Sequence, residues 1–169
     1  MSTILRPRIW FLLVTLFCAG SLGYALYVQH VDFLDPCPLC VFQRVAFMWI
    51  GLVALLAAIH NPARFGRWIY TGFLTLGGII GAVIAGRHVW LQGLPPEEVP
   101  ECGMGLNYML DTMPFGDVLA QVFYGSGECA EIDWTFLGLS MPWWTLFCYI
   151  GLTVMTLLIV AMWRGDERP

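Results

Sequence analysis

Charge is scarce in this chain, and lysine is absent altogether. Only 12% of the 169 residues are charged, whereas 59% are hydrophobic. A soluble domain is usually about one quarter charged, so this composition excludes an ordinary water-soluble domain. The sequence also lacks low-complexity tracts and internal repeats. We therefore expect a single integral membrane domain over residues 1–169, and no nucleic-acid partner.

Long apolar runs are what the chain does contain. Crossing a bilayer takes roughly 20 helical residues, and four runs reach that length, at about 9–28, 41–59, 68–86 and 143–163. Trp and Tyr residues lie near their ends, as interfacial anchors do. A signal peptide is the alternative interpretation of the first run, but the run is longer than a typical signal core. The pattern predicts an all-α membrane protein built as a four-transmembrane-helix bundle.

The arginines predict the orientation of the chain in the membrane. Six of the eight lie on one side of the predicted helices, namely Arg6, Arg8, Arg64, Arg67, Arg164 and Arg168. The positive-inside rule makes that side, with both termini, cytoplasmic. Ten of the twelve acidic residues lie on the other side, in a short loop at about 29–40 and a long loop at about 89–142. Arg44 and Arg87 also lie there, so helix placement does not explain them and both are functional candidates.

The six cysteines divide by the same topology. Four lie on the non-cytoplasmic side, namely Cys37, Cys40, Cys102 and Cys129. Disulfides persist outside the cytoplasm, so these four predict two possible disulfides. Cys18 and Cys148 fall inside apolar helices, where we expect them to pack as small hydrophobic side chains.

The Cys37-Pro38-Leu39-Cys40 segment favours redox chemistry over a structural role. A disulfide across so small a loop removes little chain entropy. The spacing instead suits thiol exchange, because both sulfurs would lie at a helix N-terminus whose dipole favours the thiolate. Two structural disulfides remain an alternative. A zinc site is disfavoured because Cys102 and Cys129 are 27 residues apart rather than close-spaced, and we expect no metal.

Arg44 follows Cys40 by four residues, which places it on the same helix face one turn deeper. There it would stabilise a thiolate or hold an electron-rich oxygen of a bound molecule. The alternative is an arginine whose charge simply reaches the membrane interface. Gln43 beside it adds a polar group.

The long loop is predicted to contain a short helix. Phe115, Val118, Leu119, Val122 and Phe123 follow the spacing of one helical face, which predicts a short helix lying in the membrane interface or packing on the core. The glycines that follow, at 125 and 127, would let Cys129 move. In the third helix, small residues spaced four apart between 77 and 86 predict close helix packing.

Taken together, three stretches and the spacing of the four predicted helices resemble the DsbB family of disulfide bond formation proteins. They read ALYVQHVDFLDPCPLCVFQR, GRHVWLQGLPPEEVPECG and GSGECAEIDWTFLGLSMPWW, with the four-helix spacing around them. The resemblance implies an enzyme of the bacterial inner membrane with periplasmic cysteines. Such an enzyme reoxidises a periplasmic DsbA-like thioredoxin-fold protein and passes the electrons to a membrane quinone, either ubiquinone or menaquinone.

The resemblance also implies roles for single residues. Cys102 and Cys129 would form the outer disulfide, with Cys102 joined to the partner in the mixed disulfide. Cys37 and Cys40 would form the second pair, with the sulfur of Cys40 facing the quinone.

Two further residues would belong to the quinone site. Arg44 matches the quinone-side cation, and His88 matches a histidine near the quinone ring, although a histidine in that position is more often an interface residue. Gln43 departs from the best-known member, which has an acid there. The alternatives are an oxidase with another thiol partner, and a non-enzymatic membrane adaptor with structural disulfides.

Overall fold

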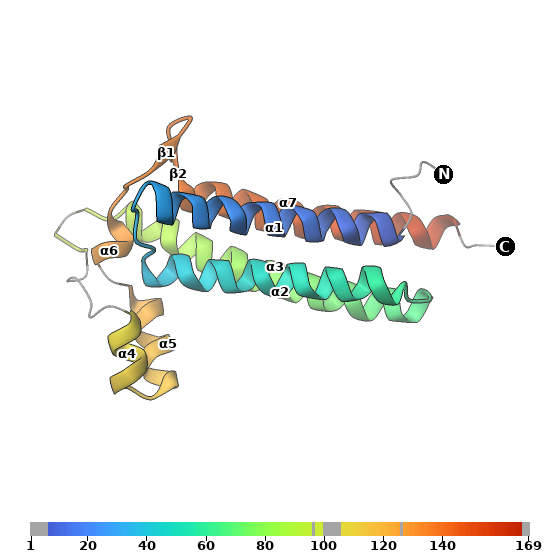
Figure 1. Cartoon of the computed structure of the whole chain (residues 1–169), viewed down its shortest axis with the longest axis horizontal. Coiled ribbons are helices and arrows are strands. Elements are labelled where there is room, and N and C mark those ends of the chain that lie inside the picture. The colour runs from blue at the N-terminus through green and yellow to red at the C-terminus, as the bar shows by residue number, and fades with distance from the viewer. Residues whose placement is uncertain (1–6, 96, 100–105, 126, 167–169) are drawn as a thin grey trace.

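Four long helices run side by side in the computed structural model, which describes residues 7–95, 97–99, 106–125 and 127–166 (Figure 1). They are α1 (Pro7–Val31), α2 (Pro38–His60), α3 (Arg64–Gln92) and α7 (Met141–Asp166). Each contains a stretch long and apolar enough to cross a membrane. The expected fold class, a multi-pass four-helix membrane protein, is therefore confirmed.

Every long helix extends beyond the predicted range. Helix α2 begins at Pro38, so Cys40 lies in its first turn and Cys37 directly before it, at the helix N-terminus as the spacing led us to expect. Helix α3 continues to Gln92 and thereby includes His88. In α3, the polar residues Arg87, His88 and Gln92 hid the continuation from a search for apolar runs, because a membrane helix can extend past the hydrocarbon layer.

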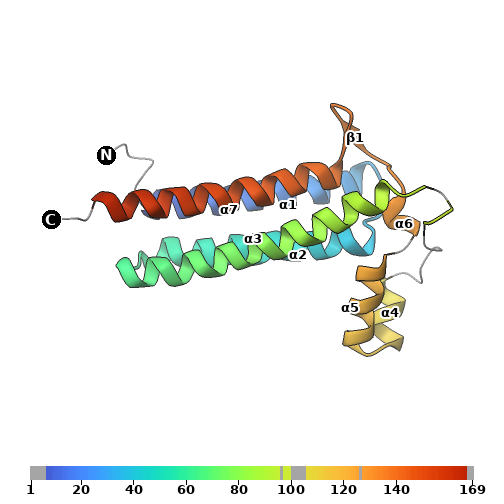
Figure 2. The same cartoon turned by 180° about the vertical axis from the view of Figure 1, so that it is seen from behind.

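The helices form two layers, with α1 and α7 in one and α2 and α3 in the other (Figures 1 and 2). Around the bundle, α1 packs on α2, α2 on α3, and α3 on α7. Small residues allow the last two contacts. A Cβ at Gly77 would lie 2.7 Å from Cδ1 of Trp49, and one at Gly81 would overlap the ring of Tyr149. Close packing by the small residues of α3 is confirmed at these positions, whereas Gly86 faces open space.

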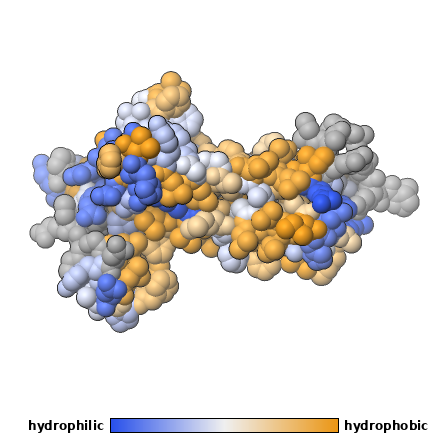
Figure 3. Space-filling model, viewed as in Figure 1, coloured by the Kyte–Doolittle hydropathy of each residue, from blue (hydrophilic) through white to orange (hydrophobic). Residues whose placement is uncertain are grey.

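Large apolar side chains cover the outside of the bundle. Leu16, Leu52 and Val83 are each more than half exposed, which suits helices surrounded by lipid tails. Hydrophilic residues gather toward the two ends of the molecule, with apolar residues between them (Figure 3).

One end of the bundle carries several short elements and is called the outer end. It holds α4 (Leu106–Thr112), α5 (Phe115–Tyr124), α6 (Gly127–Ala130), β1 (Thr135–Phe136) and β2 (Leu139–Ser140). Helices α4 and α5 project to one side of the bundle and the hairpin to the other (Figures 1 and 2). The opposite end, where α1 begins and α7 ends, is called the inner end.

The β-hairpin was not expected from the sequence. Its strands are antiparallel, with Thr135 opposite Ser140. The two residues between the strands, Leu137 and Gly138, both have positive φ, at 53° and 79°. That backbone suits the two-residue hairpin turns that match strand twist. A leucine is an unusual residue for the first position, which explains why the turn was missed.

Helix α5 divides its predicted apolar face between two environments. Val118 and Val122 are buried, at 0% and 3% exposed, in a cluster with residues of α2 and α3. Phe115 and Phe123 stay exposed, at 63% and 39%. The helix therefore packs on the bundle through Val118 and Val122, as one of the two expectations had it, and its location in the membrane interface stays a prediction.

Candidate active site

The dithiol segment forms the beginning of α2. Cys37 is the N-cap residue, and its sulfur accepts a hydrogen bond from the backbone N–H of Cys40 at 3.4 Å. Pro38 follows at the first helical position, where its missing N–H costs nothing. The two sulfurs lie 3.0 Å apart, with the thiol of Cys37 donating to the sulfur of Cys40. Both cysteines are half-buried, and the pair is close enough for exchange.

Cys129 lies beside this segment. It is 1% exposed and belongs to a cluster with Leu39, against which Cys37 also packs. The chain reaches this position through a sharp turn at Gly125, whose φ of 97° and closeness to Leu91 leave no room for a Cβ. Three of the four predicted redox cysteines thus gather at the outer end of the bundle. Cys102 lies outside the described residues.

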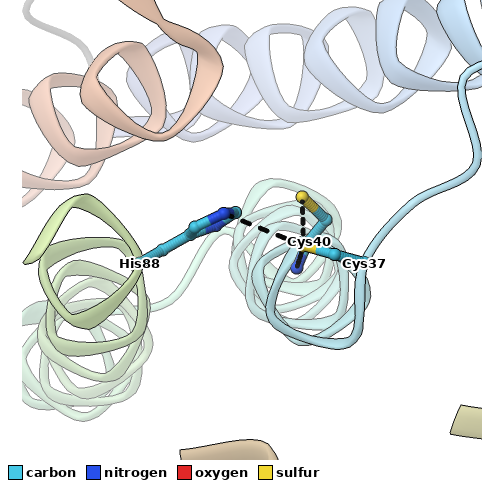
Figure 4. A group of neighbouring side chains, drawn as sticks. All are labelled: Cys37, Cys40 and His88. Carbon is cyan, nitrogen blue, oxygen red and sulfur yellow. Dashed lines mark hydrogen bonds between the residues drawn. The ribbon is translucent and has the colours of Figure 1, made fainter. Parts of the chain in front are cut away.

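His88 approaches the dithiol from α3 (Figure 4). It is only 2% exposed. Its Nε2 lies 3.8 Å from the sulfur of Cys37, and its Nδ1 lies 3.1 Å from the amide nitrogen of Gln43. The imidazole is therefore a buried group directed at Cys37, rather than an interface residue in contact with water.

Gln43 contacts the ring nitrogen of His88 that does not face Cys37, and Thr145 in turn binds Gln43. The hydroxyl of Thr145 donates to Oε1 of Gln43 at 2.6 Å. The backbone carbonyl of Gln43 accepts from the phenol of Tyr149 at 2.6 Å. Gln43 is 4% exposed, so its polar atoms are satisfied by the protein rather than by solvent. Sequence reasoning singled out Gln43 but missed Thr145, because a threonine 102 residues away in a membrane helix gives no local signal.

Arg44 turns toward α1. Its guanidinium donates to the side-chain oxygen of Gln29 and, at 3.2 Å, to the backbone carbonyl of Ala25. The carbonyl lies in the last two turns of α1, where a positive charge also interacts favourably with the helix dipole. This fixed guanidinium is half-buried and lines the cavity described next.

A cavity of about 910 Å³ lies between α1, α2 and α7 at the outer end. Such a volume is typical of small-molecule sites in proteins. The cavity reaches Cys37, Cys40, Arg44 and His88, and its remaining walls include Phe17, Gly20, Tyr24, Phe47, Ile132, Trp134, Met141 and Trp144. Most of these wall residues are apolar or aromatic, so the cavity suits a lipophilic ring next to a dithiol and a cation.

Both α1 and α7 contribute to the walls of the cavity. Near the inner end these helices meet through Phe11 and Trp163, whose ring centroids are 6.0 Å apart in an edge-on arrangement. Toward the outer end, Phe17 and Gly20 of α1 line one wall, and Trp144 and Cys148 of α7 line another.

The same side chains have the spacing of a metal site. The ligand atoms of Cys37, Cys40 and His88 all lie within 4.8 Å of one another. Thiolate and imidazole are ligands that zinc uses, and three such ligands leave a fourth position open. A reduced dithiol in this geometry is therefore able to hold a soft metal ion, which the sequence did not lead us to expect.

Arg87, the other arginine that the topology left unexplained, has a different environment. Its guanidinium donates to the backbone carbonyls of Phe123 and Tyr124 at 2.9 and 2.8 Å. It also lies over the ring of Trp90, 4.1 Å from the centroid. Arg87 therefore caps the C-terminus of α5, and its position follows from attachment of the long loop.

The two cysteines inside the membrane helices pack as expected, with one difference. Cys18 is 1% exposed in the main core and lies against Gly51. Cys148 packs partly against the same core but also lines the cavity.

Known proteins resemble this chain along most of its length. Residues 7–159 match the family model described as disulfide bond formation protein DsbB. A disulfide bond formation protein B of Methylococcus capsulatus is 51% identical over 166 residues, covering 98% of this chain and 99% of the relative. Proteins of the same description from Hahella chejuensis and Chromobacterium violaceum are 50% and 45% identical, covering 92% and 97% of this chain and 94% and 99% of those relatives. With its four membrane helices and its dithiol, the chain is an oxidoreductase that belongs to the DsbB family of disulfide bond formation proteins.

Proposed function

We propose that this protein reoxidises a DsbA-like thiol protein in the periplasm and delivers the two electrons to a quinone in the inner membrane. Within that reaction Cys102 and Cys129 form the pair that meets the partner, and Cys37 and Cys40 form the pair that meets the quinone. The observation that carries the proposal is a dithiol at the edge of a largely apolar cavity, with the long-loop cysteine Cys129 packed on its other side.

The position of the dithiol supports electron transfer from a water-soluble partner to an acceptor in the membrane. Cys37 and Cys40 lie at the junction between a membrane helix and the outer elements. Electrons arriving from a water-soluble partner reach them through the long loop. Electrons leaving them enter the cavity, which adjoins the lipid-facing helices α1 and α7.

The cavity fits a quinone as the substrate that accepts the electrons. Its walls are largely apolar, and the half-buried guanidinium of Arg44 supplies a fixed positive charge. Reduction of a quinone builds negative charge on its oxygens, and a preorganised cation stabilises that charge without reorganising. Arg44 is held by α1 on one side, so the charge stays in place throughout turnover.

Each exchange between the pairs follows one chemical rule. A thiolate attacks a disulfide sulfur in line, forms a new S–S bond, and releases the other sulfur as a thiolate. Reduction of the outer pair by the partner is followed by attack of an outer thiolate on the inner disulfide. The inner dithiol that results gives two electrons to the quinone and closes again as a disulfide.

Replacement of Cys40 separates the two halves of this reaction. We expect Cys40→Ser to retain the Cys102–Cys129 disulfide and trap the reduced partner, but to abolish quinone reduction. The assay follows quinone absorbance with purified partner and protein in nanodiscs. Cys18→Ala is the matched control, because that cysteine is buried away from the cavity. Continued turnover by Cys40→Ser would refute the proposal.

Thiol alkylation distinguishes the relay from an adaptor with structural disulfides. Structural disulfides stay blocked when reduced partner is added, whereas relay disulfides open and then close again when quinone is supplied. Extraction of the bound lipid followed by mass spectrometry identifies the acceptor as ubiquinone or menaquinone.

A further inference from the structure

Three side chains that bind soft metal ions meet at the outer start of α2. The sulfurs of Cys37 and Cys40 lie 3.0 Å apart, and Nε2 of His88 lies 3.8 Å from the sulfur of Cys37 (Figure 4). All three ligand atoms lie within 4.8 Å of one another. This set differs from the four-cysteine site that the sequence spacing disfavours, because His88 takes the place of Cys102 and Cys129.

The distances between these atoms are close to those around a zinc ion. In a tetrahedral site, Zn–S bonds of about 2.3 Å and Zn–N bonds of about 2.0 Å separate two sulfurs by about 3.8 Å, and a sulfur from a nitrogen by about 3.5 Å. Cys37 and His88 already have nearly that separation. The two sulfurs would move apart from 3.0 Å to about 3.8 Å, which small rotations of the cysteine side chains supply.

Outer contacts can orient His88 as a metal site requires. A metal-binding histidine usually donates from its other ring nitrogen to an oxygen, which leaves the lone pair on the nitrogen that binds the metal. Nδ1 of His88 lies against the side-chain amide of Gln43, and a half-turn of that amide places its oxygen there. The hydroxyl of Thr145 suits the turned amide, because it can accept from Gln43 while it donates to the carbonyl of Pro142, 2.9 Å away.

The charges in such a site would balance. Two thiolates, one neutral imidazole and one divalent ion sum to zero, so partial burial imposes little penalty on the complex. The two thiols lose their protons to solvent as the ion binds. Three protein ligands leave a fourth position, and water from the cavity that Cys37, Cys40 and His88 line can occupy it.

We propose that the reduced Cys37–Cys40 pair and His88 form a binding site for zinc, and that the bound ion inhibits oxidation of the pair. The site exists only in the reduced protein, because the thiolate is the form of cysteine that binds metals and a disulfide has none. Zinc held by both sulfurs keeps them from joining, so the S–S bond forms only after the ion leaves. Binding stands on the geometry alone, whereas inhibition rests on the proposed relay.

The first experiment measures zinc binding without partner or quinone. Cys102→Ser and Cys129→Ser remove the other outer thiols, and the inner pair is reduced by a phosphine in nanodiscs depleted of quinone. X-ray absorption of the zinc-bound protein should show two sulfurs at about 2.3 Å and an imidazole nitrogen at about 2.0 Å. Fewer sulfurs, or no imidazole nitrogen, would overturn the proposal without reference to any further variant.

Competition with a chromogenic chelator then gives the affinity for zinc. Adding His88→Gln should weaken binding at least about 100-fold, because loss of a ligand costs more than the about 10–100-fold that loss of an outer contact costs. His30→Gln is the matched control, because that histidine is exposed at the end of α1. An unchanged affinity in His88→Gln would overturn the proposal, since the dithiol alone would then hold the ion.

The second experiment measures inhibition in the same Cys102→Ser and Cys129→Ser background. At a zinc concentration ten times Kd only about one tenth of the dithiol is free, so single-turnover reduction of added quinone should slow about tenfold. A chelator should restore the rate, and magnesium, which prefers oxygen ligands, should have no effect. An unchanged rate with zinc bound would overturn the inhibition. Absence of quinone reduction even without zinc would instead refute the relay, and the binding experiment would still decide the metal site.

Discussion

The inner and outer halves of the bundle are built for different tasks. In the inner half, α1 and α7 meet through Phe11 and Trp163, and the core is filled by apolar side chains. In the outer half the same two helices line opposite walls of a cavity of about 910 Å³ that contains thiols, a guanidinium and an imidazole. The same two helices thus contribute to a packed apolar core in one half and to a reactive cavity in the other.

The largest effect on stability is expected in the inner half. Phe11 is 0% exposed, and Phe11→Ala should lower the free energy of unfolding by about 3–5 kcal/mol because it leaves a cavity in the core. The KM for quinone should not change, because the outer half is intact. Thermal unfolding in detergent measures the first quantity. Leu12→Ala, on the 40% exposed neighbour, is the control and should cost much less.

Arg44→Met should instead impair the kinetics of quinone reduction and leave stability nearly unchanged. Loss of the cation is expected to raise the KM for quinone or lower kcat by about 30–100-fold, equivalent to about 2–3 kcal/mol of transition-state stabilisation. Stability should change little, because α1 and α2 keep their apolar contact. Steady-state quinone reduction gives the kinetic constants, with Arg44→Lys expected to be intermediate. A large loss of stability with normal kinetics would reverse the assignment of the two halves.

Gly125→Ala tests how the long loop is attached. Its positive φ and the side chain of Leu91 both oppose a Cβ, so the substitution should destabilise the turn by about 1–2 kcal/mol. Exchange between the two cysteine pairs should slow, while reduction of quinone by an already reduced Cys37–Cys40 pair should not. Stopped-flow measurements separate these steps. Gly116→Ala is the control, because a Cβ at that position meets nothing within 4 Å.

The smallest effect concerns the cavity wall. Gly20 lines the cavity and Gly23 does not, yet a Cβ at either position would meet nothing within 4 Å. Gly20→Leu should therefore fill part of the cavity and raise the KM for quinone about threefold, whereas Gly23→Leu should extend into lipid with no kinetic effect. Equal effects of the two variants would argue against a ligand between α1 and α7.

Much of this arrangement could be predicted from the sequence, because it depends on local patterns. Apolar runs specify the four membrane helices, and Cys37-Pro38 specifies the start of α2. The features that were missed depend on contacts between distant segments. The bond from Thr145 to Gln43, and the capping of α5 by Arg87, join residues that no periodicity relates.

The cavity, too, could not be predicted from local sequence patterns. Its walls come from helices at opposite ends of the chain, and no local sequence pattern relates the residues of α1 that line it to those of α7. Arg44 was singled out because it broke a topological rule. Arg87 broke the same rule, yet its bonds to Phe123 and Tyr124 anchor the loop, so the rule found both unusual cations without distinguishing chemistry from attachment.

The cap at Cys37 has a mechanical consequence. Because its sulfur accepts the N–H of Cys40, the atom that exchanges electrons is also the atom that closes the end of a membrane helix. Swinging it outward would fray that helix, so the inner dithiol behaves as a stationary contact. In the proposed relay, any movement needed to bring the sulfurs of the two pairs together therefore falls to the segment that carries Cys129.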